Sequence, residues 1–193
     1  MTVNCIAILT RNDITVPNAL EIFEKNKHSK VEYWGFKDAG ISKGDGAVLA
    51  KAIKGAGKKL VYEPLVSVEA DALEAAHYAI AIRADYALGT YFKSVSDLFN
   101  KHNIKYFPPF GKRTEDQRIH GSYDELLQSA EKMFNQGCYG VRLSVYRYLD
   151  GDPETMGRYV TEKLRAMGKP FLITGSINSI ERIKFVREMK KFV

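Results

Sequence analysis

Lys37 and Glu63 are the residues whose types and positions could do chemistry. Lys37 follows an apolar segment that ends in Phe36, and Glu63 interrupts the apolar segment Leu60–Val66. A charge inside a buried strand must be paired or serve a function. A lysine amine can form a Schiff base with a ketone or aldehyde, and a buried carboxylate can move a proton beside a carbonyl. We predict Lys37 as nucleophile or electrostatic catalyst and Glu63 as acid or base; the alternative is an internal ion pair.

Other polar residues follow the apolar segments and are candidates for catalysis or binding. Asp38 adjoins Lys37, and adjacent strand residues point to opposite faces, so we expect only one of them to face inward. Asp38 is the third candidate catalytic residue. Basic residues outnumber acids among the remaining candidates, which favours a small anionic metabolite with a phosphate or carboxylate group. The candidate substrate-binding residues are Arg11, Asp13, Thr90, Lys112, Arg142, Ser144, Tyr146, Arg147, Gly175 and Ser176.

Local patterns support several of these positions. Arg142 and Ser144 alternate with apolar residues, which predicts a strand with one polar face. Gly175 and Ser176 precede a helical pattern, whose free backbone N–H groups could hold an anion. The segment 108–121 is long for a strand–helix connection and is read either as a lid over an anion or as a solvated loop. Since only Asp13, Asp38 and Glu63 could converge on a metal, we predict no metal and no cofactor.

Short apolar segments alternate with amphipathic segments along the whole chain. The apolar segments predict strands, and apolar residues at three- and four-residue spacing predict helices. Such an alternation is typical of a parallel sheet with helical crossovers. The predicted strands are Cys5–Leu9, Val31–Phe36, Leu60–Val66, Tyr86–Gly89, Ile104–Phe107, Gly140–Val145 and Pro170–Thr174. The predicted helices are Asn18–Lys25, Ala47–Ala56, Val68–Ile82, Ser94–Lys101, Tyr123–Gln136, Pro153–Met167 and Ser179–Met189.

Capping signals mark the predicted helix ends. A capping side chain stands three residues before an acid at Ser94, Ser122 and Asn178. Proline follows Asp152 at the first predicted helical position. We therefore expect these four helices to begin next to those residues.

The predicted strands recur about every 27 residues, which is the length of one unit of a (β/α)8 TIM barrel. We predict a single α/β TIM-barrel domain over residues 1–193, with seven units present and the eighth strand absent. An open doubly wound sheet is the alternative, and the sequence lacks the Gly-rich loop typical of its dinucleotide sites. Strand ends gather at one rim of a barrel, so we expect Lys37, Glu63 and Arg142 to meet in one cavity. We also expect Glu63 to share its face with Val61 and Leu65.

Composition restricts the class of protein further. The 45% hydrophobic and 27% charged residues suit a folded domain. The net charge of +6 is spread along the chain without a nucleic-acid motif, so we predict no nucleic-acid partner. No apolar run reaches the roughly 18 to 20 residues of a membrane helix, and Cys5 and Cys138 imply no oxidising compartment, which predicts a cytoplasmic location. An apolar edge left by a missing strand would make a homo-oligomer plausible.

Several short motifs resemble those of a family of uncharacterised bacterial TIM-barrel proteins. The resemblance covers nearly the whole chain and implies an eighth strand ending in a Gly-Ser-Ala-like turn, which this sequence does not contain. The family places an acid at the position of Arg142. The motifs are Leu9-Thr10-Arg11-Asn12-Asp13 with Thr15-Val16-Pro17-Asn18-Ala19-Leu20, Gly35-Phe36-Lys37-Asp38, Tyr146-Arg147-Tyr148 and Gly175-Ser176-Ile177-Asn178-Ser179.

That family is in turn similar to the phosphate-binding barrels that include keto-deoxy-phosphogluconate and keto-hydroxyglutarate aldolases. The resemblance implies aldolase-like cleavage of a small phosphorylated or carboxylated carbonyl compound. Those aldolases carry their Schiff-base lysine on the sixth strand, where this sequence has none, so Lys37 would be a relocated nucleophile. A phosphosugar isomerase or epimerase that uses Glu63 with Asp13 or Asp38 is one alternative. A non-catalytic barrel that binds an anionic metabolite is the other.

Overall fold

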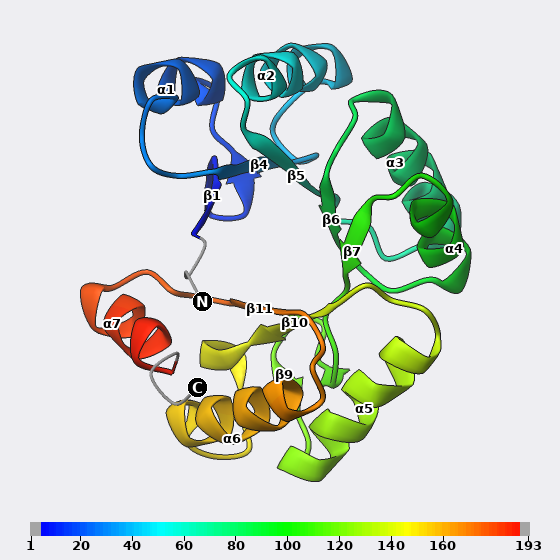
Figure 1. Cartoon of the computed structure of the whole chain (residues 1–193), viewed down its shortest axis with the longest axis vertical. Helices are drawn as coiled ribbons and strands as arrows, with labels where there is room; N and C mark the ends of the chain where they lie inside the picture. Colours follow the sequence, from blue (N-terminus) through cyan, green and yellow to red (C-terminus); the bar gives the residue numbers. More distant parts are fainter. Residues whose placement is uncertain (1–4, 190–193) are drawn as a thin grey trace. The chain divides into compact units, whose positions relative to one another are not determined.

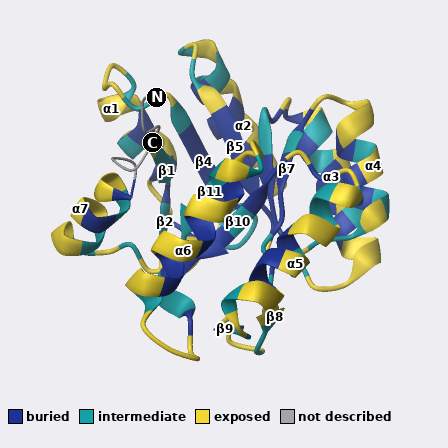
Figure 2. Cartoon of the chain, turned by 60° about the horizontal axis from the view of Figure 1, so that its bottom comes forward, coloured by how far each residue is buried: buried dark blue, intermediate teal, exposed yellow. Residues whose placement is uncertain are grey.

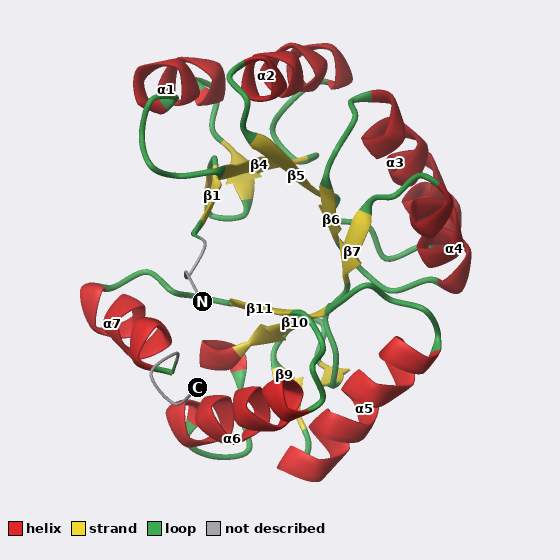
Figure 3. Ribbon diagram, in the orientation of Figure 1, coloured by secondary structure: helices red, strands yellow, loops and turns green. Residues whose placement is uncertain are grey.

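The computed structural model describes residues 5–189 and shows two compact units, Met1–Tyr106 and Phe107–Val193. Strands and helices alternate in both units, and the described residues contain seven α-helices (Figure 1, Figure 3). The predicted α/β class with a parallel sheet is therefore confirmed. Each predicted strand and helix is present, with its ends shifted by a few residues.

The first unit is built on a five-stranded sheet with the strand order β1-β4-β5-β6-β7. The pairs β1–β4, β4–β5 and β5–β6 are parallel. Helices connect the strands and pack against the sheet (Figure 1). The strands are β1 (Ile6–Ile8), β4 (Tyr33–Lys37), β5 (Lys59–Glu63), β6 (Tyr86–Leu88) and β7 (Lys105–Phe107), and the helices are α1 (Ala19–Asn26), α2 (Lys43–Gly55), α3 (Glu69–Ala81) and α4 (Lys93–Lys101).

The two faces of this sheet carry different residues: one packs into the apolar core, and the other carries the candidate catalytic lysine. Trp34 and Phe36 of β4 point into the apolar core that β4 and β5 share with the helices. Gly35 lies on the opposite face, and a Cβ at this position would lie 2.4 Å from the Val61 carbonyl oxygen. Lys37 follows Gly35 by two residues and therefore shares its face. Alternation along one strand thus separates the core from the candidate chemistry.

The second unit has a parallel pair, β10 (Val141–Ser144) and β11 (Phe171–Thr174). The Arg142 N–H donates to the Pro108 carbonyl at 2.9 Å, so the chain after Phe107 runs beside β10. Figure 2 shows buried residues along the strands and on one side of the helices, with exposed residues on the other side. The helices are α5 (Tyr123–Asn135), the short 3₁₀ helix η1 (Val145–Arg147), α6 (Pro153–Ala166) and α7 (Ile180–Glu188).

Two short antiparallel hairpins follow strands and were not expected from the sequence. In the first unit β2 (Thr10–Arg11) pairs with β3 (Ile14–Thr15), and in the second β8 (Lys112–Arg113) pairs with β9 (Ile119–His120). The segment 108–121 is thus a hairpin, which packs into the apolar core of its unit through the fully buried side chains of Phe110 and Ile119.

Several expectations about element ends were wrong. β5 ends at Glu63, so Leu65 is 49% exposed and does not share the Glu63 face. β10 ends at Ser144, so the predicted strand residue Val145 begins η1 instead. The strand ladders of residues 5–189 are a five-stranded sheet and separate two-stranded pairs, and in this range they form no closed ring of eight. None of the helices in that range is long and apolar enough to cross a membrane.

The helix starts are confirmed at two capping residues and wrong at two others. Ser122 forms the expected capping box with Glu125, and the Asp152 side chain accepts the Thr155 N–H. Ser94 instead lies inside α4, where its hydroxyl donates to the Glu69 carboxylate. α7 is capped by Ser179, one residue after Asn178. At both Ser94 and Asn178 another polar side chain lies within hydrogen-bonding reach, and the local sequence does not show which side chain will cap the helix.

Candidate functional site

Lys37, Glu63 and Asp13 lie together at the carboxyl ends of the first unit's strands. Lys37 is opposite Glu63 in the parallel register of β4 and β5. The Lys37 Nζ is 2.6 Å from Asp13 Oδ1 and 3.6 Å from Glu63 Oε2. The Lys37 and Glu63 side chains are each only 9% exposed, whereas that of Asp13 is 57% exposed. We call these three residues the acid–base cluster.

The β2–β3 hairpin brings Asp13 to Lys37. Asn12 and Asp13 have φ of 52° and 63°, and two positive φ values are what a tight two-residue hairpin turn needs. Thr15, which is fully buried, joins this hairpin to β4: its hydroxyl donates to the Lys37 carbonyl at 2.8 Å and accepts the Lys37 N–H at 2.9 Å. Thr15 was not predicted as a site residue, and its only sequence signal is a hydroxyl beside apolar neighbours.

Asp38 lies on the other side of the strand from the acid–base cluster. Its Oδ1 accepts the backbone N–H groups of Ala39 and Leu65, both at 2.9 Å. Burial, and secondarily the Asp38 carboxylate, raise the pKa of Tyr62, whose side chain belongs to the helix-facing core. Asp38 therefore braces two turns, and Lys37 is the inward-facing residue of the adjacent pair.

Of the other binding residues expected in the first unit, Thr90 forms a hydrogen bond to a backbone carbonyl and Arg11 is exposed. The Thr90 hydroxyl donates to the Val66 carbonyl at 2.8 Å, and the Thr90 carbonyl accepts the Tyr106 hydroxyl. Arg11 is exposed on the β2–β3 hairpin. The Thr90 contacts and the exposed position of Arg11 do not place either residue in the acid–base cluster.

The second unit contains three arginines whose charges act on one another: Arg113, Arg142 and Arg147. We call them the arginine cluster. Burial, followed by the charges of Arg142 and Arg147, lowers the pKa of Arg113 to about 10. The Arg113 guanidinium donates to the Gln117 carbonyl at 3.0 Å and to the Ser144 hydroxyl at 3.4 Å. Arg113 was not among the expected binding residues; its neighbour Lys112 was, and it is exposed, 3.2 Å from Glu125.

Ser144 links the arginine cluster to the end of β11. Its hydroxyl lies 3.4 Å from that of Thr174, the last residue of β11. Gly175 follows with φ +80°, and a Cβ there would lie 2.7 Å from the Ser144 Cβ, so this position requires glycine. The next residue, Ser176, has its carbonyl bound to Arg182 at 2.6 Å. Because α7 begins only at Ile180, Gly175 and Ser176 are a turn before the helix and not its first turn.

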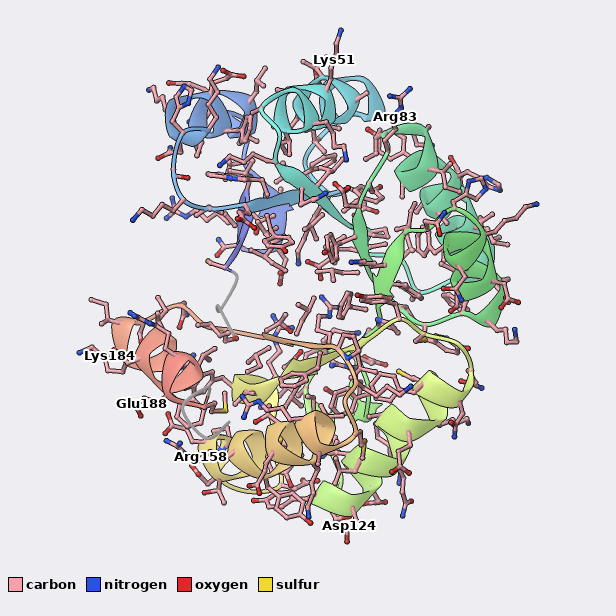
Figure 4. All side chains as sticks on the ribbon, viewed as in Figure 1. Lys51, Arg83, Asp124, Arg158, Lys184 and Glu188 are labelled. Atoms are coloured by element: carbon pink, nitrogen blue, oxygen red, sulfur yellow. The ribbon has the colours of Figure 1, made fainter. Side chains whose placement is uncertain are left out.

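Tyr146 belongs to a different contact set. Its hydroxyl donates to Glu154 at 3.1 Å, and Arg182 lies 4.3 Å from its ring centroid. Burial and the Glu154 carboxylate raise the pKa of Tyr146 to about 12. The surrounding helices are also joined at their surface, where Arg158 of α6 and Glu188 of α7 form an ion pair at 3.7 Å (Figure 4).

Six of the expected residues belong to one of these two clusters. Lys37, Glu63 and Asp13 form the acid–base cluster, and Arg142, Arg147 and Ser144 lie around Arg113. In residues 5–189 no group of three His, Cys, Asp or Glu side chains is arranged to hold a metal ion.

Strand–helix alternation with polar groups after the strands defines a TIM-barrel-like α/β fold, and solved structures of that class resemble this chain. The glycerol uptake operon antiterminator regulatory protein of Listeria monocytogenes str. 4b F2365 is 15% identical over 96% of this chain and 87% of its own, with a TM-score of 0.61. A 4-hydroxy-2-oxoglutarate/2-dehydro-3-deoxyphosphogluconate aldolase is 16% identical over 90% and 73%, with a TM-score of 0.57.

Orotidine 5′-phosphate decarboxylase of Pyrococcus horikoshii OT3 is 12% identical over 96% of this chain and 97% of its own, with a TM-score of 0.53. No family model matches the chain, and no curated protein matches its sequence. At such identities the likeness shows the fold alone. The distant similarity to aldolase barrels is confirmed at this level, and the motif resemblance stays a prediction.

Proposed function

We propose that this chain is a TIM-barrel enzyme that acts on a small phosphorylated or carboxylated carbonyl compound by aldol-type carbon–carbon cleavage. The acid–base cluster is the observation that carries the proposal. It places an amine against two carboxylates, with Lys37 and Glu63 each 9% exposed, at the strand ends where barrels carry their chemistry. A buried acid and base beside each other are suited to making and stabilising an enolate.

Each residue of the cluster has a role in the cleavage direction. Glu63 takes the proton of the hydroxyl on the carbon β to the substrate carbonyl. The carbon–carbon bond breaks, the new carbonyl leaves, and the electron pair of the broken bond forms the enolate. The protonated Lys37 amine stabilises the enolate oxygen, and Asp13, 2.6 Å from that amine, orients it. Return of a proton to the enolate carbon releases the second product.

A covalent version uses Lys37 as a Schiff-base nucleophile. It requires the Lys37 amine to lose a proton and its hydrogen bond to Asp13 before it can attack a carbonyl. Borohydride added with a panel of 2-oxo acids would trap the imine as a stable adduct, and mass spectrometry would locate it. An adduct at Lys37 supports the covalent route, and its absence leaves the non-covalent route.

Isomerisation is the second candidate function. It is favoured because two carboxylates, those of Asp13 and Glu63, lie against the same Lys37 amine. An isomerase moves a proton between two carbons, and Asp13 and Glu63 could serve as the two proton carriers. Cleavage and isomerisation share the enolate, so one assay separates them. Cleavage yields two carbonyl products, whereas isomerisation in D2O yields a single product that carries deuterium.

The test is a ¹H NMR assay in D2O with small 2-oxo acids and phosphorylated ketoses. We expect turnover by the wild-type chain, with kcat reduced roughly 10²- to 10⁴-fold in Glu63→Gln and Lys37→Met. Lys54→Met is the matched control, because Lys54 also binds a carboxylate, that of Asp85 at 2.8 Å, outside the cluster. The control should keep its activity. Full activity in Glu63→Gln would refute the assignment, and binding of these compounds without turnover would favour a non-catalytic barrel.

A further inference from the structure

Thr15 attaches the β2–β3 hairpin to the end of β4 through both its side chain and its backbone. The register between β1 and β4 ends at the pair Ile8–Gly35, two residues before Lys37. Beyond that pair the Thr15 hydroxyl donates to the Lys37 carbonyl at 2.8 Å and accepts the Lys37 N–H at 2.9 Å. The Thr15 N–H donates to the Ala39 carbonyl at 2.8 Å. A fully buried side chain thus binds the strand end where the neighbouring strand stops.

The contact between Asp13 and Lys37 depends on this attachment. The Asp13 side chain is 57% exposed, and an exposed ion pair by itself does little to hold two side chains in one geometry. The distance of 2.6 Å between Asp13 Oδ1 and Lys37 Nζ therefore requires a backbone that presents the carboxylate to the amine. Asp13 precedes Thr15 by two residues in the hairpin, so the bonds that fix Thr15 also fix the position of Asp13.

The hairpin also packs against the turn that follows β4. Gly40 in this turn has φ +85°, and a Cβ there would lie 2.7 Å from the Thr15 carbonyl oxygen. The turn therefore leaves little room for the hairpin to move. Loss of the hydroxyl would release the hairpin from Lys37 itself, on the side of β4 where Asp13 meets the amine.

We propose that Thr15 is a positioning residue: its hydroxyl holds the β2–β3 hairpin so that the Asp13 carboxylate stays against the Lys37 amine. This inference rests on the proposed function for the reaction that the amine serves. In that reaction the ammonium of Lys37 stabilises the enolate oxygen, and a displaced Asp13 would leave the ammonium poorly oriented. A misplacement of about 1 Å can cost about 10²-fold in rate, so the effect of Thr15 is expected in kcat.

The test compares Thr15→Val, which removes the hydroxyl and keeps the volume, with Thr15→Ser, which keeps the hydroxyl. In the D2O assay we expect Thr15→Val to lower kcat about 10- to 100-fold with KM within about two-fold of wild type, and Thr15→Ser to stay within about three-fold in kcat. Circular dichroism shows whether each variant is folded. Thr161→Val is the matched control, because Thr161 is 1% exposed and its hydroxyl donates to the Gly157 carbonyl at 2.7 Å within α6. It should lose stability and keep its kcat.

A double-mutant cycle with Asp13→Asn tests whether Thr15 acts through Asp13. In the Asp13→Asn background, Thr15→Val should lower kcat by less than about two-fold further, because the contact that Thr15 supports is already lost. An equal loss in both backgrounds would refute this route.

Labelling of the Lys37 amine separates the proposal from the proposed function, because it needs no substrate. Reductive methylation with formaldehyde and borohydride, located by mass spectrometry, requires the amine to give up its hydrogen bond to Asp13. We expect Lys37 to be labelled several-fold faster in Thr15→Val than in wild type, and at the wild-type rate in Thr15→Ser and Thr161→Val.

Faster labelling in Thr15→Val, combined with a wild-type chain that turns over no compound of the panel, would refute the proposed function alone. Wild-type turnover together with unchanged kcat and unchanged labelling in Thr15→Val would refute the positioning role alone. A loss of kcat in Thr161→Val equal to that in Thr15→Val would also overturn the positioning role, since the loss would then follow from lower stability.

Discussion

Replacing Lys37 by Met tests how the acid–base cluster is held together as well as what it does. The substitution removes the ammonium 3.6 Å from the Glu63 carboxylate and 2.6 Å from that of Asp13. Glu63 is 9% exposed, so little water can replace the lost charge. Breaking a buried ion pair from one side destabilises a protein by about 3 to 5 kcal/mol. Asp13 is 57% exposed, and an exposed pair contributes about 1 kcal/mol or less.

We therefore expect Lys37→Met to lower the free energy of unfolding by about 3 kcal/mol and Asp13→Asn to lower it by less than about 1 kcal/mol. The double variant Lys37→Met/Glu63→Met replaces both charges by apolar side chains of similar length. Such replacements are often neutral, so we expect it to unfold within about 1 kcal/mol of wild type. The double variant should thus be more stable than the single variant while remaining inactive.

The assay is urea unfolding followed by tryptophan fluorescence. Trp34 is the chain's one tryptophan, lies on β4 and is 5% exposed, so its emission reports on the first unit specifically. This choice matters because two compact units need not unfold in one transition. A cost below about 1 kcal/mol for Lys37→Met, or a double variant less stable than the single one, would refute the buried-pair reasoning.

Three further predictions concern the scaffold. Gly35→Ala places a Cβ 2.4 Å from a β5 carbonyl oxygen and should lower stability by about 1 to 3 kcal/mol by Trp34 fluorescence, whereas Gly55→Ala, with open space around it, should not. Hydrogen bonds from the Gly121 backbone N–H and from His120 lower the pKa of the Asp150 carboxyl. The ionised carboxylate therefore stabilises the fold fully above the pKa of an ordinary aspartate, and this stabilisation is lost as the pH falls through the lowered pKa. Asp150→Asn should lower the thermal midpoint at pH 7 but not at pH 3. Ser122→Ala should cost about 1 kcal/mol by circular dichroism, and more than Ser94→Ala.

The pairing of Lys37 with Glu63 could be predicted from sequence because it depends on only two rules. Consecutive strands of a βαβ unit are neighbours in a parallel sheet, and residues at matching positions past the apolar stretch share one end of it. Apolar runs in the sequence predict both strands, and the parallel register of β4 and β5 then places Lys37 opposite Glu63. The choice between Lys37 and Asp38 was open in the sequence, and the Asp38 contacts with two backbone N–H groups decide it.

Asp13 as the closest partner of Lys37 could not be predicted, because its position depends on a hairpin too short for periodicity. Each strand of that hairpin has two residues, and its turn uses the left-handed conformation at Asn12 and Asp13 without glycine. Asn and Asp tolerate that conformation better than other side chains. The tie between Thr15 and the Lys37 backbone then fixes the hairpin, and a contact over 22 residues leaves no local signal.

Arg113 shows why net charge is a poor guide to the environment of a single charged residue. The excess of +6 is spread along the sequence, and in the segment 108–121 Lys112, Arg113 and Arg118 have equal claims. Tertiary contacts separate them: Lys112 and Arg118 reach carboxylates, whereas Arg113 is drawn beside Ser144 and toward two other arginines. The relevant quantity is the charge left uncompensated after the chain has folded, and burial raises its effect because water no longer screens it. By that criterion Arg113, which the sequence does not distinguish from its neighbours, differs from them because its guanidinium donates to a carbonyl and a hydroxyl and not to a carboxylate.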